Sequence, residues 1–376
     1  MLEGRYFRPG VALACAAALA FPSPSLARNQ NPASPLVPPS LYQALADFFP
    51  VGAAVWKGDL SGEHAELLKK HFISITPENY MKWQYLRPSE GVYDFSQADA
   101  LASFAAENHL RMRGHTLVWH QQNPAWLFKD AAGRDLQATP EDKTLLLQRL
   151  QDHIRTVVAH YKNAVYAWDV VNEVIDPAEP DGFRRSRWFQ ITGTDFIDVA
   201  FRAAREAAPG AVLFINDYDT TEPVKRTFLY NLVRDLRRRG IPVDGVGHQM
   251  HIHLKEPSVD SVVQSIQMFS QLGVDNPVTE LDVSVYPDSG NRESFSSVST
   301  EMLLQQGRRY RDLFAAFRGL KGQLSGVTFW GVADDHTWLK QYPFPRLDLP
   351  LLFDDKLQPK YAFWGIVDPA SLPTTP

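Results

Sequence analysis

Eight short apolar runs, separated by segments with helical periodicity, constrain the fold of this chain more strongly than any other feature of its sequence. The runs are rich in β-branched and aromatic residues, which is typical of β-strands. They lie at residues 51–55, 72–76, 111–116, 165–171, 212–216, 243–249, 277–282 and 326–330. Because strands that are connected by helices pair in parallel, the alternation predicts an α/β fold.

The segments between the runs carry helix signals. One begins at Thr139, a residue suited to cap a helix, and continues with a first-turn proline. Two others keep their apolar residues on one face and end at Gly240 and Gly273. Eight strand–helix units predict a single (β/α)8 TIM barrel, with the active site at the C-terminal ends of the strands. The alternative is a doubly wound open sheet, but no glycine-rich phosphate turn follows the first run.

The N-terminal segment has the features of a secretory signal peptide. Two arginines precede an apolar stretch at residues 11–21, and small residues up to Ala27 form a cleavage site. The apolar stretch is too short to span a bilayer, which takes about 20 residues. We therefore predict that residues 1–27 are removed and that the mature chain is secreted, to the periplasm or the medium, without membrane association. The alternative is an unprocessed leader.

The rest of the chain shows a linker and one domain. Residues 28–40 are rich in proline, asparagine and serine and predict a linker, after which residues 41–376 contain no second linker. The net charge is −5, and the basic run at residues 237–239 ends a predicted helix, where cations stabilise the helix dipole. The sequence therefore gives no indication of nucleic-acid binding. We expect a monomer.

Polar and aromatic residues end or follow most of the predicted strands, at the barrel end where active sites lie. They are His115, Asn172, Glu173, the segment 216–218, Gln249, His251, Glu280, Asp282 and Trp330. This distribution predicts one polar cleft.

Glu173 follows the fourth run and Glu280 lies near the end of the seventh. These two strands face each other across an eight-stranded barrel. Either glutamate alone could be a structural salt-bridge partner. As a pair, they are suited to glycoside hydrolysis, in which one carboxyl group is protonated and the other is ionised. Two like charges in a dry site cannot both ionise cheaply, so proximity itself separates their pKa values.

Five motifs, spread over residues 45–366, together resemble glycoside hydrolase family 10. They are ENYMKW at 78–83, GHTLVWH at 114–120, WDVVNE at 168–173, TELD at 279–282 and the segment from Trp330 to Trp338. The resemblance implies a retaining endo-β-1,4-xylanase that acts on xylan and xylo-oligosaccharides without a cofactor. It makes residues 41–376 the catalytic domain, Glu173 the acid/base and Glu280 the nucleophile. It also implies that His251 bonds Glu280 and is steadied by Asp282.

The resemblance and the chemistry of sugars together suggest the residues that bind substrate. Asn172 is suited to bond the 2-hydroxyl of the reacting sugar, and broad indole rings stack on the apolar faces of sugars. The predicted binding residues are Glu78, Asn79 and Lys82 on the glycone side, His115, Trp119, His120 and Gln122 around the reacting sugar, Gln249 and His251, Tyr218 on the aglycone side, and Trp330 and Trp338. We expect Trp126 to belong to the core instead.

Three alternatives stay open at this level. His248, His251 and His253 could bind a metal, although glycoside hydrolysis needs no Lewis acid and we predict none. A related barrel enzyme could cleave β-glucan or mannan with the same glutamates. A polysaccharide-binding protein without activity would be expected to lack one of these glutamates.

The chain also departs from the family pattern after Trp338. Family members often carry a basic residue directly after this tryptophan, whereas this chain has Leu339 followed by Lys340.

Overall fold

Eight parallel strands close into a barrel in the computed structural model, which describes residues 39–291 and 293–375. Neighbouring strands pair in sequence order, and the barrel closes where the last strand pairs with the first. The barrel strands are β1 (Val51–Val55), β2 (Ser74–Pro77), β3 (Arg111–Val118), β4 (Val165–Asn172), β5 (Val212–Asp217), β6 (Gly245–His248), β8 (Val278–Ser284) and β9 (Val327–Phe329). The predicted TIM barrel is confirmed. The predicted signal peptide and nearly all of the predicted linker lie outside the described residues.

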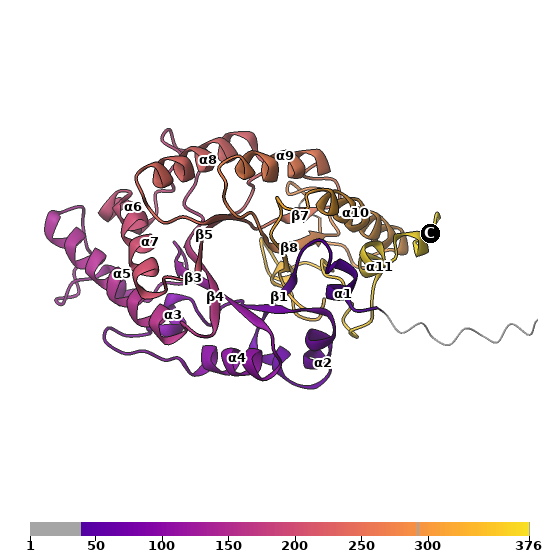
Figure 1. Cartoon of the computed structure of the whole chain (residues 1–376), viewed down its shortest axis with the longest axis horizontal. Coiled ribbons are helices and arrows are strands. Elements are labelled where there is room, and N and C mark those ends of the chain that lie inside the picture. Colours follow the sequence, from indigo (N-terminus) through magenta and orange to yellow (C-terminus); the bar gives the residue numbers. More distant parts are fainter. Residues whose placement is uncertain (1–38, 292, 376) are drawn as a thin grey trace, which may run out of the picture. The chain divides into compact units, whose positions relative to one another are not determined.

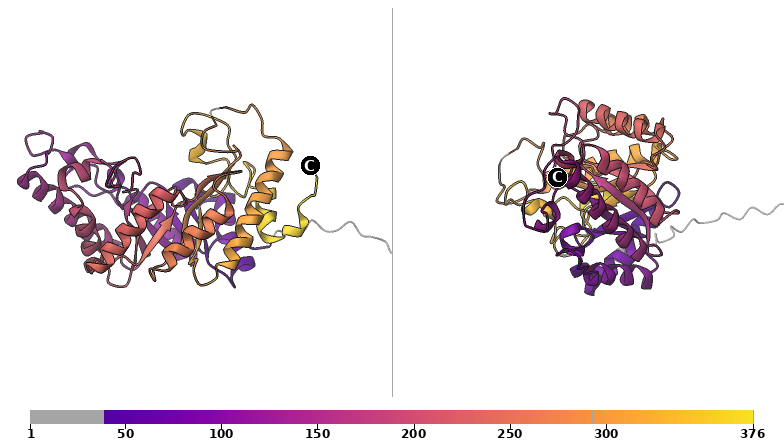
Figure 2. Two further views of the ribbon diagram at one scale, coloured as in Figure 1. Left: turned by 90° about the horizontal axis from the view of Figure 1, so that it is seen from above. Right: turned by 90° about the vertical axis from the view of Figure 1, so that its left-hand side faces the viewer.

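Helices cover the outside of the barrel, as Figure 1 shows. They are α1 (Leu41–Leu45), α2 (Gly62–His71), α3 (Trp83–Leu86), α4 (Ser96–Glu107), α5 (Pro140–His160), α6 (Arg187–Thr192), α7 (Asp195–Ala207), α8 (Pro223–Arg238), α9 (Val259–Ser270), α10 (Thr300–Gly319) and α11 (Tyr361–Val367). Short 3₁₀ turns lie at η1 (Lys57–Leu60), η2 (Ala125–Phe128), η3 (Trp338–Lys340) and η4 (Pro369–Ser371). The connection between β8 and α10 extends away from the strands (Figure 2). Among the described residues, no helix is both long and apolar enough to cross a membrane.

The local sequence signals explain where these helices begin and end. The Thr139 side chain accepts a hydrogen bond from the backbone N–H of Asp142, which caps α5. Gly240, just after α8, has φ of 72°, and Gly273, after α9, has φ of 63°, a region that glycine enters without penalty. The predicted beginning of the first helix and the ends of the other two are thus confirmed.

The sixth predicted strand differs from the observed one. The sequence predicts a continuous strand over residues 243–249, but β6 ends at His248 and a separate short strand, β7 (His251–His253), pairs with β8. Between them the chain turns at Met250, whose φ is 64°. Gln249 and His251 therefore do not share one regular strand, because a residue in the left-handed region breaks the extended backbone. The third strand continues to Val118, two residues beyond its predicted end, so His115 lies farther from the strand end than predicted.

Large side chains fill the space between the barrel and its helices, where Trp168 of β4 packs against Tyr161, the residue after α5. A Cβ atom added at Gly114 of β3 would lie 2.2 Å from the Trp168 ring of β4, so only glycine permits this approach. Trp168 is fully buried, and so are most apolar residues of both strands. Because close-packed interiors transmit small shifts, this packing fixes the strand ends that carry the polar residues.

Candidate functional site

A cleft of about 440 Å³ lies at the C-terminal ends of the strands. Every residue that was predicted to be catalytic or to bind substrate lines it: Glu78, Asn79, Lys82, His115, Trp119, His120, Gln122, Asn172, Glu173, Tyr218, Gln249, His251, Glu280, Trp330 and Trp338. Its lining also includes four residues that were not predicted, Gln121, Arg184, Asp219 and Tyr342. Asp282 does not line this cleft but is fully buried and borders a neighbouring cavity.

Glu280 of β8 is buried among hydrogen-bond donors. Its Oε1 accepts from Asn216 Nδ2 at 2.7 Å, and its Oε2 lies 3.1 Å from His251 Nε2. His115 Nδ1 lies 3.9 Å from Oε1. Burial by itself would raise the pKa of Glu280, but the His251 hydrogen bond and the nearby cations lower it to about 2. The geometry therefore keeps this carboxylate ionised.

His251 stands between two carboxylates. Its Nδ1 lies 2.9 Å from Asp282 Oδ2, which also accepts a hydrogen bond from Trp338 Nε1 at 2.9 Å. Burial opposes the charge on His251, but Asp282 and Glu280 together raise its pKa well above the ordinary value. A protonated imidazole donates on both sides, so it both aims and stabilises the Glu280 carboxylate. The predicted contacts among these residues are present.

Glu173 has a different environment at the end of β4. Its Oε1 accepts from two amides, Asn172 Nδ2 and Gln249 Nε2, both at 3.2 Å. These donors are neutral, and burial raises the pKa of Glu173 above its ordinary value. His120 Nδ1 lies 3.7 Å from Oε2, but burial lowers the pKa of His120 to about 4, which keeps that imidazole neutral near pH 7. Glu173 is therefore suited to carry a proton.

The backbone of Glu173 is held in an uncommon conformation. Its φ is 59°, a region that non-glycine residues rarely adopt. Its N–H donates to the Asn216 carbonyl at 2.8 Å, and its carbonyl accepts from Arg184 Nε at 2.7 Å. Asp219 and Gln122, which also line the cleft, have positive φ values of 49° and 48°. Unusual backbone conformations that gather at one cleft are a frequent mark of a functional site.

Asn216, at the end of β5, connects the two glutamates. Its Nδ2 donates both to Glu280 and to Asn172 Oδ1, the latter at 2.8 Å, and Asn172 in turn donates to Glu173. Its Oδ1 accepts from the Thr279 hydroxyl at 2.7 Å, which fixes the orientation of the amide. The sequence placed Asn216 at a strand end but gave it no role. Its function depends on a contact with β8 that no local pattern predicts.

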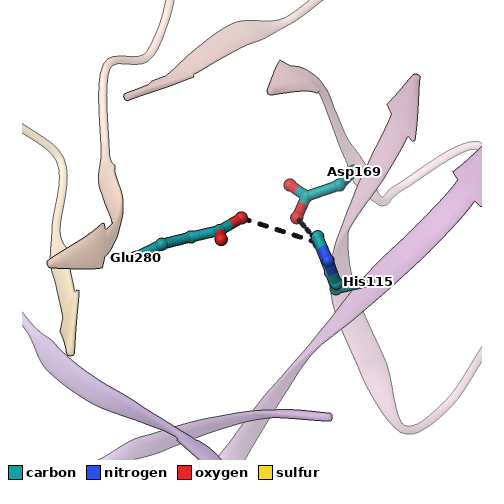
Figure 3. Close-up of side chains that lie close together, drawn as sticks. All are labelled: His115, Asp169 and Glu280. Atoms are coloured by element: carbon teal, nitrogen blue, oxygen red, sulfur yellow. Dashed lines mark hydrogen bonds and ion pairs between the residues drawn. The ribbon is translucent and has the colours of Figure 1, made fainter. Parts of the chain in front are cut away.

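His115, Asp169 and Glu280 approach one another closely enough to suggest a metal site, and Figure 3 shows their side chains. The groups are already engaged within the protein. Asp169 Oδ2 pairs with Arg113 Nη1 at 2.6 Å and with His115 Nδ1 at 2.8 Å. A cation there would have to compete with the Arg113 guanidinium, so the arrangement fits a buried ion-pair network better than a metal site.

The three histidines that could have formed a metal site do not come together. His248 is buried and bonds Thr220 and Asn276, whereas His253 lines a second cavity beside the cleft. Trp126 packs against the core and donates to the Arg87 carbonyl at 3.2 Å, as expected of a core residue.

Polar side chains on the loops after β2 and β3 form one side of the cleft. Asn79 Oδ1 accepts from Lys82 Nζ at 3.2 Å and from Gln122 Nε2 at 3.1 Å. Lys82 Nζ lies 4.6 Å from the centre of the Trp119 ring. Burial lowers the pKa of Lys82 to about 8, although the nearby glutamates oppose the shift. These residues present a cation, an amide and an aromatic face, which suits the hydroxyls and C–H faces of a sugar.

Aromatic residues that follow β9 form another wall of the cleft. Trp330 packs edge-on against His115, and Trp338 stacks on Tyr342 with ring centres 5.1 Å apart. Tyr342 is 60% exposed and extends this aromatic surface toward solvent. Lys340, which departs from the family pattern, instead donates to the Asp334 carbonyl and does not line the cleft.

Tyr218 was expected to form an aglycone platform and does line the cleft. Its hydroxyl accepts from Arg184 Nη2 at 2.6 Å. Lys225 Nζ lies 3.1 Å from the ring centre, so one face of the ring is already covered.

The comparison with known proteins agrees with this geometry. Residues 40–369 match the family described as glycosyl hydrolase family 10. The chain belongs to this family. Membership of family 10 makes the chain a glycoside hydrolase.

Several family 10 relatives are similar over most of their length. A thermostable celloxylanase of Thermoclostridium stercorarium is 47% identical over 341 residues, which cover 89% of this chain and 88% of that protein. The crystal structure of xylanase B from Clostridium stercorarium F9 has a TM-score of 0.86 at 47% identity and covers 88% of this chain and 100% of that one. An intracellular xylanase from Thermoanaerobacterium saccharolyticum, solved as a glutamate-to-alanine variant with xylotetraose, has a TM-score of 0.79 at 41% identity and covers 88% of this chain and 98% of its own.

Proposed function

We propose that this family 10 enzyme is an endo-β-1,4-xylanase that hydrolyses xylan and xylo-oligosaccharides with retention of anomeric configuration. The observation that carries the proposal is the pair of glutamates in one sugar-sized cleft, where buried Glu280 is kept ionised and the pKa of partly buried Glu173 is raised. Relatives that are named xylanases, and a related structure with xylotetraose, support xylan as the substrate.

In the first step, Glu173 is the general acid and Glu280 is the nucleophile. Glu280 Oε2 or Oε1 attacks the anomeric carbon and forms an ester bond to the sugar, while the bond to the leaving oxygen breaks. The Glu173 proton moves to that oxygen, so that the aglycone leaves as an alcohol. The raised pKa of Glu173 supplies the proton, and the lowered pKa of Glu280 supplies the free carboxylate.

In the second step, Glu173 is the general base. Having lost its proton, it takes one from a water molecule that attacks the anomeric carbon of the glycosyl-enzyme. The ester bond to Glu280 breaks, and the carboxylate returns to its hydrogen bonds with Asn216 and His251. Two inversions at the same carbon give net retention.

The surrounding residues are assigned to substrate by their position in the cleft. Asn172 lies between the two glutamates through its hydrogen bonds, where it can reach the 2-hydroxyl of the reacting sugar. Lys82, Asn79 and Glu78 bind the glycone side. Trp338 closes the cleft above His251, and a xylose ring, which lacks a hydroxymethyl group, fits beside an indole that would crowd glucose.

Proton NMR of the anomeric signals during hydrolysis of xylohexaose tests this function, with cellohexaose in parallel. We expect initial release of β-anomer from xylohexaose alone. Initial α-anomer would mean inversion and would remove Glu280 from its role as nucleophile. Cleavage of cellohexaose instead would keep the glutamates but change the substrate to β-glucan, a result that the name of the celloxylanase relative makes worth testing.

We also propose that the mature enzyme is a secreted monomer that begins after Ala27. The apolar leader and its cleavage site support export, and they lie outside the described residues. Mass spectrometry of protein recovered from the periplasm and from the medium tests both the cleavage site and the compartment, and light scattering tests the oligomeric state.

A further inference from the structure

A histidine outside the cleft is bonded to one of the residues that line it. His336, in the loop after β9, lies with Nε2 3.1 Å from Oε2 of Glu78, which follows β2. Glu78 lines the cleft, whereas His336 does not. Because β1 lies between β2 and β9 in the sheet, this contact joins two loops across the end of β1. His336 is therefore connected to the cleft through Glu78.

The imidazole of His336 is held by packing on one side. Its ring stacks on Trp56, the residue after β1, with ring centres 4.5 Å apart and planes 18° apart. A ring that is fixed by stacking presents its nitrogen in one direction. The hydrogen bond to Glu78 is therefore directional rather than a chance contact of two mobile side chains.

The loop that carries His336 is also anchored on both sides. Before it, buried Asp334 pairs with Lys360 Nζ at 2.6 Å. After it, Trp338 donates to buried Asp282 at 2.9 Å. These contacts anchor the loop through two buried carboxylates. His336 therefore has a fixed position from which it can orient Glu78.

Charges around His336 come from several elements. Glu78 bonds it directly, Asp59 of η1 lies nearby, and Asp335 precedes it in the chain and pairs with His64 of α2 at 2.9 Å. The Glu78 hydrogen bond raises the pKa of His336 above its ordinary value of 6.5, with Asp59 and Asp335 adding to the effect. The imidazole is thus a charged donor over a wider pH range than a free histidine.

We propose that His336 is a positioning residue that orients the Glu78 carboxylate to bind a sugar on the glycone side, one unit beyond the reacting sugar. His336 occupies Oε2, and Oε1 makes no hydrogen bond within the described part of the chain, so Oε1 can accept from a sugar hydroxyl. A carboxylate that is held in place before binding loses less rotational freedom when the sugar arrives. This inference rests on the proposed function, because it takes Glu78 as a sugar ligand.

Two aryl glycosides separate this role from catalysis. An aryl β-xylobioside places a second sugar on the glycone side, whereas an aryl β-xyloside fills only the reacting position. His336→Phe keeps a ring on Trp56 and removes the hydrogen bond, while His336→Gln keeps a donor. We expect His336→Phe to raise KM for the xylobioside about two- to fivefold, the range for partly exposed charge pairs. Its kcat, and its kinetics on the xyloside, should change little, and His336→Gln should restore most of the loss.

Two further variants make the test specific. His64→Gln removes a neighbouring ion pair but does not touch Glu78, and should leave KM for the xylobioside unchanged. In a Glu78→Gln background, His336→Phe should add no further increase in KM. In the wild-type enzyme, KM for the xylobioside alone should rise as pH rises through the raised pKa of His336, because the imidazole loses its charge. This pH dependence should be weaker in His336→Gln. Because it is measured on the wild-type enzyme and on His336→Gln, the test holds even if the His336→Phe variant does not fold.

The outcomes distinguish this inference from the proposed function. Normal xylobioside KM in His336→Phe, with impaired KM in Glu78→Gln, would overturn the positioning role and leave the xylanase intact. Equal impairment by His64→Gln would show a general effect of the loop and would also overturn it. A wild-type enzyme that cleaves no xyloside or xylo-oligosaccharide would instead overturn the proposed function.

Discussion

The ends of β4 and β8 carry the same residue type in the same cleft, yet they give it opposite properties. Glu280 on β8 is surrounded by a charged imidazole, an amide and a second histidine, and its pKa is lowered. Glu173 after β4 accepts hydrogen bonds from neutral amides, and burial raises its pKa. The comparison teaches that burial alone favours the protonated acid, and that a buried carboxylate stays ionised only where a cation is built beside it.

The two ends also differ in backbone. Glu280 lies within strand β8, whereas Glu173 has a left-handed backbone that is held by Asn216 and Arg184. A nucleophile needs a fixed line of attack on one carbon. An acid that later serves as a base must face both the leaving oxygen and the incoming water, and a side chain that extends from a turn suits that double role.

Replacement of the nucleophile should give the largest effect. Glu280→Ala removes the group that forms the covalent bond, so kcat on xylohexaose should fall by at least about 10⁴-fold. Binding of xylo-oligosaccharides should remain close to that of the wild-type enzyme, because the cleft walls are untouched. Single-turnover kinetics and calorimetric titration with xylotetraose measure the two quantities, and wild-type turnover in this variant would contradict the assignment.

Replacement of the acid should give a smaller effect that depends on the leaving group. Glu173→Ala should reduce kcat/KM on xylohexaose by about 10²- to 10⁴-fold, the usual contribution of general acid catalysis. Formation of the glycosyl-enzyme from an aryl xyloside with an acidic phenol should be nearly unaffected, because that leaving group needs no proton. Stopped-flow measurement of the phenol burst checks this. An equal loss on both substrates would mean that Glu173 and Glu280 do not have separate roles.

Removal of the cation beside Glu280 should make the pKa of Glu280 more similar to that of Glu173. His251→Gln retains a neutral donor but loses the charge that lowers the pKa of Glu280. The carboxylate should then protonate at higher pH, so the acidic limb of kcat/KM should move up by about one to two pH units. Activity near pH 7 should fall by about tenfold, since His251 also orients the nucleophile. An acidic limb that does not move would show that His251 has only a structural role.

The smallest expected effect concerns Arg184, which holds the Glu173 backbone and lies close enough for the Glu173 charge to raise its own pKa. Arg184→Met removes a cation that favours ionised Glu173, so the pKa of Glu173 and the alkaline limb of kcat/KM should move up slightly. We expect a loss of about two- to fivefold in kcat/KM. Arg184→Lys keeps the charge and should hold the alkaline limb in place, which separates the electrostatic effect from the loss of the hydrogen bond. A downward shift of the alkaline limb in Arg184→Met would contradict the electrostatic effect of Arg184 on Glu173.

Local patterns in the sequence predicted much of this architecture. The β-rich runs, the Thr139 cap and the glycines after α8 and α9 depend on neighbouring residues only, and all agree with the structure. The break at Met250 could not be predicted, because residues on both sides favour extended backbone and the turn is imposed by pairing with β8. Strand propensity describes each run but not where the barrel forces it to bend.

The candidate site shows the same limit. The motifs predicted both glutamates and most of the cleft lining, because those residues lie within the strands or in the segments that follow them. Asn216, Arg184, Tyr342 and His336 act through contacts with segments far away in the chain. Asn216 alone gave a usable signal, since it ends a strand on the rim of the barrel. The others lie in loops whose course is set by tertiary packing.

Trapping the covalent intermediate tests the central difference between the two glutamates most directly. A 2-fluoro-xylosyl fluoride should react with the nucleophile and then hydrolyse slowly, because the fluorine destabilises the oxocarbenium-like transition state. Peptide mass spectrometry of the inactivated enzyme should find the sugar as an ester on Glu280, with Glu173 unmodified. The ester on Glu173, or inhibition without any covalent label, would contradict the assignment of a charged nucleophile on β8 and a protonated acid after β4.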